Sequence, residues 1–172
     1  MGSVVAQAYG AELFGFLIGV LDERRAAREV YTAVLERLPE EAARFAAVCS
    51  ARTLAYTLAR RELGRRRDGD FVKRASRTTD ECSSSTPQAG SPYRSRSQAN
   101  LITSIRSRLA PRDLEMLILR IDRQMTWRDL AMTSIGPGST SKLEAEAKRL
   151  RARFRRLSEH IERSAKRRGP GS

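Results

Sequence analysis

Apolar residues recur at helical spacing along most of this chain, and one internal segment interrupts the pattern. In the first 66 residues they form three stripes with a period near 3.6, the period of an amphipathic α-helix. Between residues 68 and 100 the stripes disappear, and Ser, Pro and Gly become frequent. Periodicity returns at residue 101, and no stretch alternates with the period of two that indicates a strand. The sequence therefore predicts an all-α protein.

The interruption divides the chain into two candidate domains. We predict small helical domains at residues 4–67 and 101–168, joined by a flexible linker at residues 68–100. The first domain is expected to be a three-helix unit in which Pro39 ends the second helix or begins the next one. Domains of this size bury little core each, so marginal stability is expected unless a partner covers apolar surface.

The charge balance indicates the kind of partner. The chain has 33 Lys and Arg against 20 Asp and Glu, a net charge of +13, which predicts nucleic acid or a membrane surface. The longest apolar run, residues 13–21, is too short for a bilayer, which takes about 20 residues. Cys49 and Cys82 lack metal-ligand spacing and are typical of a reducing compartment. We expect a cytoplasmic protein without a membrane partner, a metal or another cofactor.

The final predicted helix is the most basic segment. Residues 141–168 carry 11 Lys and Arg and four Glu around an apolar seam. Such a helix can pack through its seam and present guanidinium groups outward, where their planar forks pair with phosphate or with guanine. One flank of the seam holds Lys148, Arg151 and Arg155, and the other holds Arg149, Arg153 and Arg156. Taken alone, the segment fits a solvated basic helix or one strand of a coiled coil as well as it fits a DNA-binding helix.

The helices that precede this segment favour DNA binding. A helix from Pro111 to Ile121, a short helix from Met125 to Met132 and a Gly-Pro-Gly turn lead into the basic helix. This is the layout of a helix-turn-helix, whose second helix enters the major groove. The turn, placed at residues 134–141, is longer than the three or four residues usual for the motif, which predicts an offset recognition helix.

The motifs of the C-terminal half occur in the order of a known family. Residues 109–120 read LAPRDLEMLILR, residues 125–131 read MTWRDLA and residues 150–157 read LRARFRRL. In this order they resemble region 4 of bacterial sigma factors, which reads LPPRQREVLLLR, then LSYEEIA, then a basic helix.

The N-terminal half is similar to region 2 of the same family. Residues 30–38, VYTAVLERL, resemble its LVQEVFLRLW, and residues 50–60, SARTLAYTLAR, resemble its SFRTWAYTIAR.

The resemblance implies a sigma factor of the small extracytoplasmic-function type, which is not an enzyme. In that family, region 2 binds the clamp helices of RNA polymerase and recognises and melts the −10 element. Region 4 binds the polymerase flap and reads the −35 element, and the linker runs through the polymerase channel. The implied partners are therefore the polymerase core and promoter double-stranded DNA, with an anti-sigma factor as a further candidate. Outside the holoenzyme the protein is expected to be a monomer.

The resemblance also implies three sets of site residues. The polymerase-binding set is Val30, Tyr31, Val34, Leu35 and Leu38. The −10 set is Arg52, Tyr56, Arg60 and Arg61. The −35 set is Lys148, Arg149, Arg151, Arg153, Arg155 and Arg156.

The departures from the family are concentrated in region 2. Thr32 and Ala33 occupy acidic or amide positions of the clamp-binding helix, and Pro39 stands where a Trp is usual. Ala51 and Leu54 replace aromatic residues around the melting helix. Because aromatic rings stabilise unpaired bases by stacking, −35 recognition is the firmer prediction and unaided strand opening the weaker one.

Two other functions stay open. A stand-alone helix-turn-helix regulator keeps the C-terminal motif but is expected to dimerise on a palindrome. A basic coiled-coil adaptor or RNA-binding module is expected to show weak sequence preference, because phosphate contacts carry no sequence information. His160 has no nucleophile or second base beside it in the pattern, which argues against an enzyme. Trp127 is expected to be a core aromatic of the helix-turn-helix and not a DNA wedge.

Overall fold

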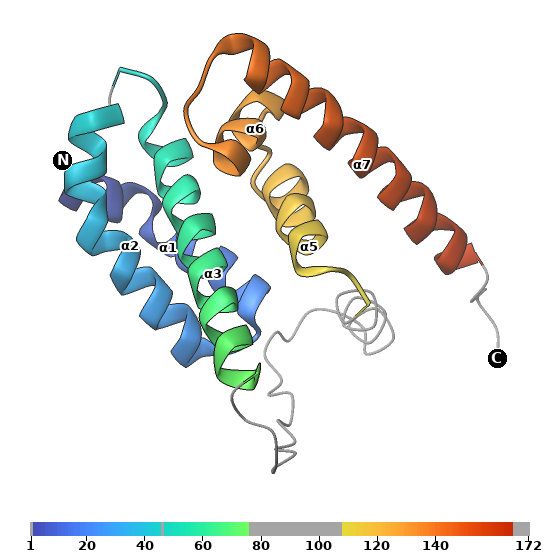
Figure 1. Ribbon diagram of the computed structural model, residues 1–172, viewed down its shortest axis with the longest axis horizontal. Coiled ribbons are helices and arrows are strands. Elements are labelled where there is room, and N and C mark those ends of the chain that lie inside the picture. Colours follow the sequence, from blue (N-terminus) through green and yellow to red (C-terminus); the bar gives the residue numbers. More distant parts are fainter. Residues whose placement is uncertain (1, 46, 76–107, 167–172) are drawn as a thin grey trace.

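The computed structural model describes residues 2–45, 47–75 and 108–166, and their regular structure is all helical (Figure 1). The all-α prediction is confirmed for these residues. The helices are α1 (Gly2–Leu21), α2 (Arg24–Phe45), α3 (Ala51–Ala75), α5 (Pro111–Leu117), the π-helical turn η1 (Ile118–Asp122), α6 (Trp127–Ile135) and α7 (Thr140–Lys166). None of these helices combines the length and the apolarity that a bilayer crossing requires.

The N-terminal half is the three-helix unit that the stripes predict, but the expected break at Pro39 is wrong. Helix α2 runs through Pro39 and ends at Phe45. Leu38 and Ala42, on either side of the proline, are both buried in the core, while Pro39 itself is exposed. Packing of the buried face therefore keeps the helix continuous, and the hydrogen bond that proline cannot make is lost on the solvent side.

In the C-terminal half, the turn between the last two helices is shorter than the sequence suggested. Helix α6 ends at Ile135 and α7 begins at Thr140, so the connection is residues 136–139 and has the length usual for the motif. Gly136 ends α6 with φ of +81°, a backbone conformation that side chains with a Cβ rarely adopt. The predicted turn at residues 134–141 was too long because both helices extend into it.

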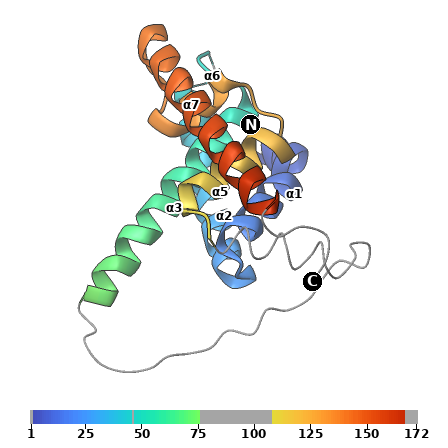
Figure 2. The ribbon, with the colours of Figure 1, turned by 90° about the vertical axis from the view of Figure 1, so that its right-hand side faces the viewer.

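The two halves pack against each other and share one hydrophobic core. Buried residues of the N-terminal half, such as Phe16 and Leu58, belong to the same cluster as Leu119 and Leu130 of the C-terminal half. Helix α3 lies against α6 (Figures 1 and 2), and α1 contacts both α5 and η1. The sequence predicted two domains that each bury little apolar surface. Packing of the two halves against each other adds buried apolar surface to both. That each half folds by itself stays a prediction.

The boundaries of the predicted linker move in the structure. Helix α3 continues to Ala75, so residues 68–75 extend the helix in place of beginning a tether. Figure 2 shows this end of α3 extending away from the rest of the bundle. The remainder of the predicted linker, residues 76–100, lies outside the described residues, as do residues 101–107, which the prediction assigned to the second domain.

Candidate nucleic-acid interface

The start of α6 is defined by a side-chain cap. The Thr126 hydroxyl accepts a hydrogen bond from the backbone N–H of Asp129 at 3.1 Å, and it donates one to the Asp129 carboxylate at 2.6 Å. A threonine that accepts from the third helical residue satisfies one of the free N–H groups at a helix start. Asp129 also accepts a hydrogen bond from Thr53 of α3 at 3.1 Å. The cap therefore sets the start of the helix-turn-helix and ties it to the N-terminal half.

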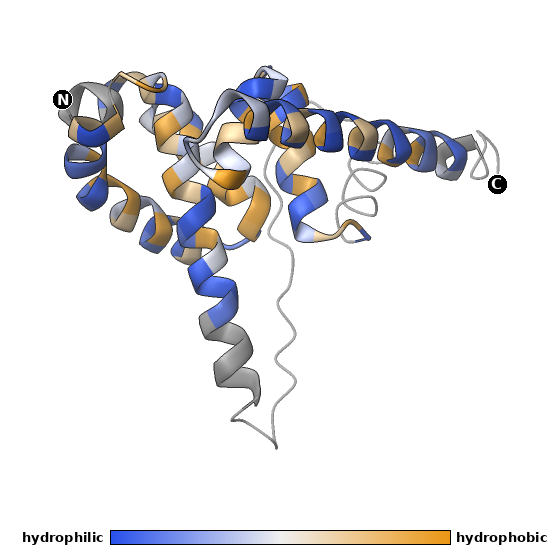
Figure 3. Ribbon diagram, turned by 45° about the horizontal axis from the view of Figure 1, so that its top comes forward, coloured by the Kyte–Doolittle hydropathy of each residue, from blue (hydrophilic) through white to orange (hydrophobic). Residues whose placement is uncertain are grey.

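Helix α7 is anchored through the first half of its apolar seam. Leu143, Ala147 and Leu150 are buried against the core, whereas Phe154 and Leu157 farther along are only partly buried. The helix has 27 residues and is therefore about 40 Å long. Figure 3 shows its later turns projecting beyond the body of the protein, with hydrophilic residues over most of the visible surface. The anchored half thus fixes the direction of a long basic helix.

The outward face of α7 has a narrow centre and basic flanks. At about 100° per residue, Ser141, Ala145 and Ala152 lie opposite the buried seam, and all three are exposed. These side chains are short, so the helix backbone can come close to a surface that it faces. Longer basic side chains follow on both sides of this line, Lys148 and Arg155 on one and Arg149 and Arg156 on the other. A short centre between long cationic flanks suits a helix lying in a groove with phosphates on either rim.

Four of the six residues predicted for the −35 element belong to this outward face. Lys148, Arg149, Arg155 and Arg156 are exposed. The side chain of Arg149 is 73% exposed although it pairs with Glu146 one turn earlier at 2.8 Å. That of Arg155 is 79% exposed and lies 3.9 Å from Glu159. The Arg155–Glu159 pair is exposed on both sides and is therefore weak, so Arg155 can exchange a carboxylate for a phosphate at small cost. The carboxylate of Glu146 is only 7% exposed, so Arg149 keeps a partner on the protein side while most of its own side chain faces solvent.

The other two predicted residues are also exposed, but each of them contacts another helix of the protein. Arg153 donates to the Asp113 carboxylate at the start of α5. Arg151 lies over the ring of Trp127, 6.0 Å from its centre. These two side chains lie at the edges of the seam, where they support the packing of α7 as well as flank the outward face.

Trp127 is a packing residue, as predicted. Its ring meets Phe154 of α7 edge-on, with the ring centres 5.5 Å apart. The guanidinium of Arg120 lies 4.8 Å from the Trp127 ring centre and donates to the Met125 carbonyl at 2.7 Å. Cation–π and edge-on contacts of this kind hold α6, η1 and α7 together. Trp127 is therefore not presented as a wedge for DNA.

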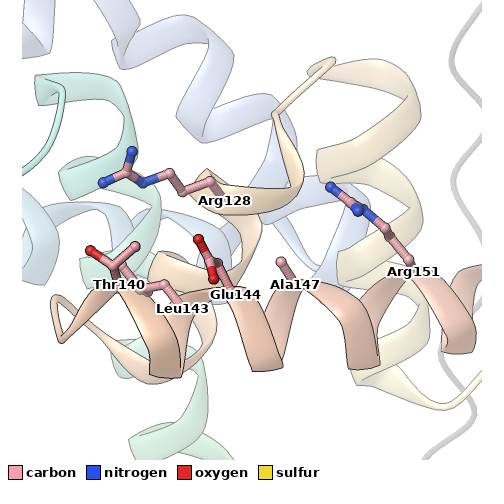
Figure 4. Close-up of a pocket in the computed structure, with 6 residues that line it drawn as sticks. All are labelled: Arg128, Thr140, Leu143, Glu144, Ala147 and Arg151. Carbon is pink, nitrogen blue, oxygen red and sulfur yellow. The ribbon is translucent and has the colours of Figure 1, made fainter.

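The first turn of α7 adds candidate residues that the sequence analysis left out. A hollow of about 190 Å³ lies between α6 and α7 and is lined by residues that include Arg128, Thr140, Glu144 and Arg151. Figure 4 shows Glu144 and Arg151 pointing from α7 toward the α6 side, with Arg128 reaching from α6 above Thr140. Recognition helices contact base edges with their N-terminal residues. We therefore add the exposed Thr140, Ser141 and Lys142 to the candidate site. The sequence analysis missed them because it placed the end of the turn at residue 141, and α7 begins at Thr140.

Three of the four residues predicted for the −10 element face inward. Tyr56 is buried and donates to Glu12 of α1 at 3.0 Å. Arg52 also donates to Glu12, and it donates to the Arg123 carbonyl of the C-terminal half at 2.8 Å. Burial, together with the bond to Glu12, raises the pKa of Tyr56. Burial opposes ionisation of Glu12, but the bonds from Arg52 and Tyr56 and the charge of Arg123 lower its pKa.

Arg60 forms the most buried ion pair of the interface between the halves. Its guanidinium lies 3.0 Å from the carboxylate of Glu115, and the two side chains are only 13% and 3% exposed. Arg60 also donates to the Thr133 hydroxyl at 3.1 Å, so it joins α3 to both α5 and α6. Arg67 approaches the same carboxylate from the next turns of α3. The fourth predicted residue, Arg61, is exposed and lies beside Gly136.

The residues predicted to bind polymerase form part of the protein's own core. Val30, Val34 and Leu38 are buried, and Tyr31 and Leu35 are partly buried and packed on the same cluster. The stripe is the inward face of α2, which contacts α1 and α3. A regular apolar stripe cannot by itself distinguish a core face from a partner face, which is why the sequence suggested docking.

No protein-family model, curated protein or solved structure matches the chain. Among the described residues, no group of three or more His, Cys, Asp or Glu side chains is placed to hold a metal ion.

Proposed function

We propose that the protein is a bacterial sigma factor of the extracytoplasmic-function type and that α7 is its recognition helix for the −35 element. The observation that carries the proposal is the outward face of α7 behind a turn of helix-turn-helix length, residues 136–139. The motif order of residues 109–157, which resembles region 4 of the family, supports the same function. The excess of 33 basic over 20 acidic residues supplies the long-range attraction to DNA.

Recognition would divide between the two parts of this face. The first turn, with Thr140, Ser141 and Lys142, would read base edges, because these side chains lie at the N-terminus of the second helix. Arg149 and Arg156 would bind phosphates on one rim of the groove. Replacing a first-turn residue should then change the preferred sequence, and replacing a flanking arginine should weaken binding to all sequences alike.

Fluorescence anisotropy with labelled duplexes tests the DNA-binding part. The affinity should fall linearly with the logarithm of salt concentration, and Arg149→Ala should reduce that slope by roughly 0.9. Arg25→Ala is the matched control, because Arg25 is an exposed arginine of α2 whose side chain is 86% accessible and far from α7 in sequence. Equal slopes for the two variants would contradict the assignment of α7 as the DNA-binding helix.

Binding of the N-terminal half to −10 DNA, which a sigma factor carries out on the polymerase, needs a rearrangement of the two halves. Tyr56, Arg52 and Arg60 are covered by Glu12 and by the C-terminal half. In the sigma proposal Arg52 and Arg60 contact −10 DNA only after the C-terminal half has separated from α3. Tyr56 would in addition have to leave its contacts with Glu12 and Phe16 of α1. Gel filtration with bacterial core polymerase tests the proposal, and co-elution in a one-to-one complex is the expected result.

A second candidate is favoured by one observation. The stripe of Val30, Val34 and Leu38 lies in the core and offers no apolar docking surface. This suits a stand-alone helix-turn-helix regulator, which needs no polymerase. Failure to co-elute with polymerase, combined with a dimer that prefers a palindromic duplex, would support this candidate over the sigma factor.

A further inference from the structure

A recess lined by arginines lies at the junction of the two halves. Its volume is about 250 Å³, and side chains from α3, α5, α6 and α7 line it. Five of the lining residues are Arg60, Arg112, Arg149, Arg153 and Arg156, and the one acidic lining residue is Glu146. The recess is smaller than the roughly 300–1,000 Å³ typical of sites for drug-sized ligands. It therefore suits a compact, strongly charged ligand.

The charges around the recess are not balanced. Arg60 pairs with Glu115, Arg149 with Glu146 and Arg153 with Asp113. Arg112 and Arg156 have no carboxylate partner among the described residues. Five arginines line the recess against these three carboxylates, so two positive charges of the lining have no carboxylate partner. Like charges held together repel, so an anion that enters the recess is stabilised by all of them.

We propose that this recess binds a compact phosphate anion, such as the pyrophosphate group of a small molecule. Guanidinium forks match phosphate oxygens in geometry and donate paired, charge-assisted hydrogen bonds. The Ser134 hydroxyl, which also lines the recess, can donate a further bond. Two linked phosphates fit a volume of this size, whereas an attached larger group would extend into solvent.

Occupancy of the recess has a structural consequence. Arg60 belongs to α3, whereas Arg112 belongs to α5 and Arg156 to α7. An anion that bonds to all three holds the two halves together at the interface that the Arg60–Glu115 pair already stabilises. It also engages Arg149, Arg153 and Arg156, so the ligand should compete with DNA. This competition, unlike the site itself, rests on the proposed function.

Isothermal titration of the full chain with inorganic pyrophosphate tests the site. Arg112→Gln and Arg156→Gln should each weaken pyrophosphate binding about tenfold, since each removes charge-assisted hydrogen bonds. Arg155→Gln is the matched control, because Arg155 is the neighbouring arginine on α7 but does not line the recess. Equal losses in the control, or binding no tighter than that of sulfate at equal ionic strength, would overturn the proposal.

The same variants separate a free phosphate from a DNA phosphate. Pyrophosphate should displace a labelled duplex from the wild-type chain, and Arg112→Gln should raise the concentration required. A chain that binds pyrophosphate but no duplex would keep the site and remove the proposed function. Unmeasurable pyrophosphate binding, together with weaker duplex binding by Arg112→Gln, would assign the recess to the DNA backbone and overturn the small-molecule site.

Discussion

Helices α3 and α7 are both rich in arginine, yet the structure uses their arginines in opposite ways. On α3, Arg52 and Arg60 face the C-terminal half and bond to buried or partly buried acceptors. On α7, Arg149 and Arg155 face solvent, with side chains 73% and 79% exposed. A buried guanidinium is held by its partners, whereas an exposed one can take a new anionic partner. Arg52 and Arg60 of α3 therefore stabilise the fold, and Arg149 and Arg155 of α7 are exposed for binding.

This comparison changes the interpretation of the N-terminal half. The resemblance assigned the arginines of α3 to DNA, but their present partners are Glu12, Glu115 and the Arg123 carbonyl. A DNA-binding role for them requires breaking these contacts. The packed arrangement therefore leaves the basic face of α7 exposed and covers Arg60 of α3.

The largest expected effect follows from breaking the buried pair on the α3 side. Glu115→Gln leaves the guanidinium of Arg60 without its charge partner, and we expect a loss of about 3 kcal/mol in the free energy of unfolding. Urea denaturation followed by circular dichroism measures it. The double variant Arg60→Met with Glu115→Met should recover most of the loss, because no unpaired charge remains. A loss below about 1 kcal/mol for Glu115→Gln would show that the pair behaves like a surface pair.

The next effect concerns the turn that joins α6 to α7. Gly136→Ala places a Cβ on a residue with φ of +81° and 3.2 Å from the Arg61 guanidinium, so we expect a loss of about 1–2 kcal/mol. Thermal or urea unfolding measures the change. Gly138→Ala is the matched control two residues later, since its Cβ would meet open space. Similar losses for both variants would indicate that any substitution in the turn is destabilising, and that the positive φ of Gly136 is not the cause.

A smaller effect is expected from Glu12, which holds Arg52 and Tyr56. The pKa of Glu12 is lowered from 4.5 in the folded protein, so below about pH 4.5 the unfolded state binds more protons. Stability from this carboxylate is therefore present above that pH and is lost as the pH falls through the folded-state pKa. Melting temperatures measured from pH 6 to pH 3 should fall less steeply in Glu12→Gln than in the wild type. Identical slopes would mean that Glu12 is not held as the structure indicates.

The smallest loss of stability is expected from breaking the ion pair between Arg153 of α7 and Asp113 of α5. Asp113→Asn removes the partner of Arg153, whose side chain is 46% exposed, and we expect a loss of less than about 1 kcal/mol. The same urea experiment as for Glu115→Gln gives a direct comparison of the two carboxylates. If the Asp113 variant loses as much stability as the Glu115 variant, the contrast between the two helices does not hold.

Much of the fold could be predicted from the sequence, because helical periodicity is a local signal. The stripes placed α1, α2 and α3, and the Gly-Pro-Gly turn placed the boundary between α6 and α7. Two local predictions were wrong: α2 continues through Pro39, and α6 and α7 extend into the predicted turn. At Pro39, burial of Leu38 and Ala42 outweighs the local breaking tendency of proline. At the turn, α6 does end at Gly136, and the error was in the position of the two helix ends, which local patterns define least well.

The candidate site was predicted only in part. Arg149 and Arg155 could be placed on an outward face because Leu143 and Leu150 define the inward one by spacing alone. The inward position of Tyr56 and the burial of Val34 could not be predicted, since both depend on which helix packs against which stripe.

The sequence by itself determined that the chain is helical, that its charge favours anionic partners and that α7 has an apolar seam with basic flanks. These properties follow from composition and from spacing along the chain. The tertiary structure decided which arginines are free, because only the packing of α3 against α5 and α6 brings Glu115 to Arg60. Residues 60 and 115 are far apart in sequence, and no local pattern records that a carboxylate will meet a guanidinium there.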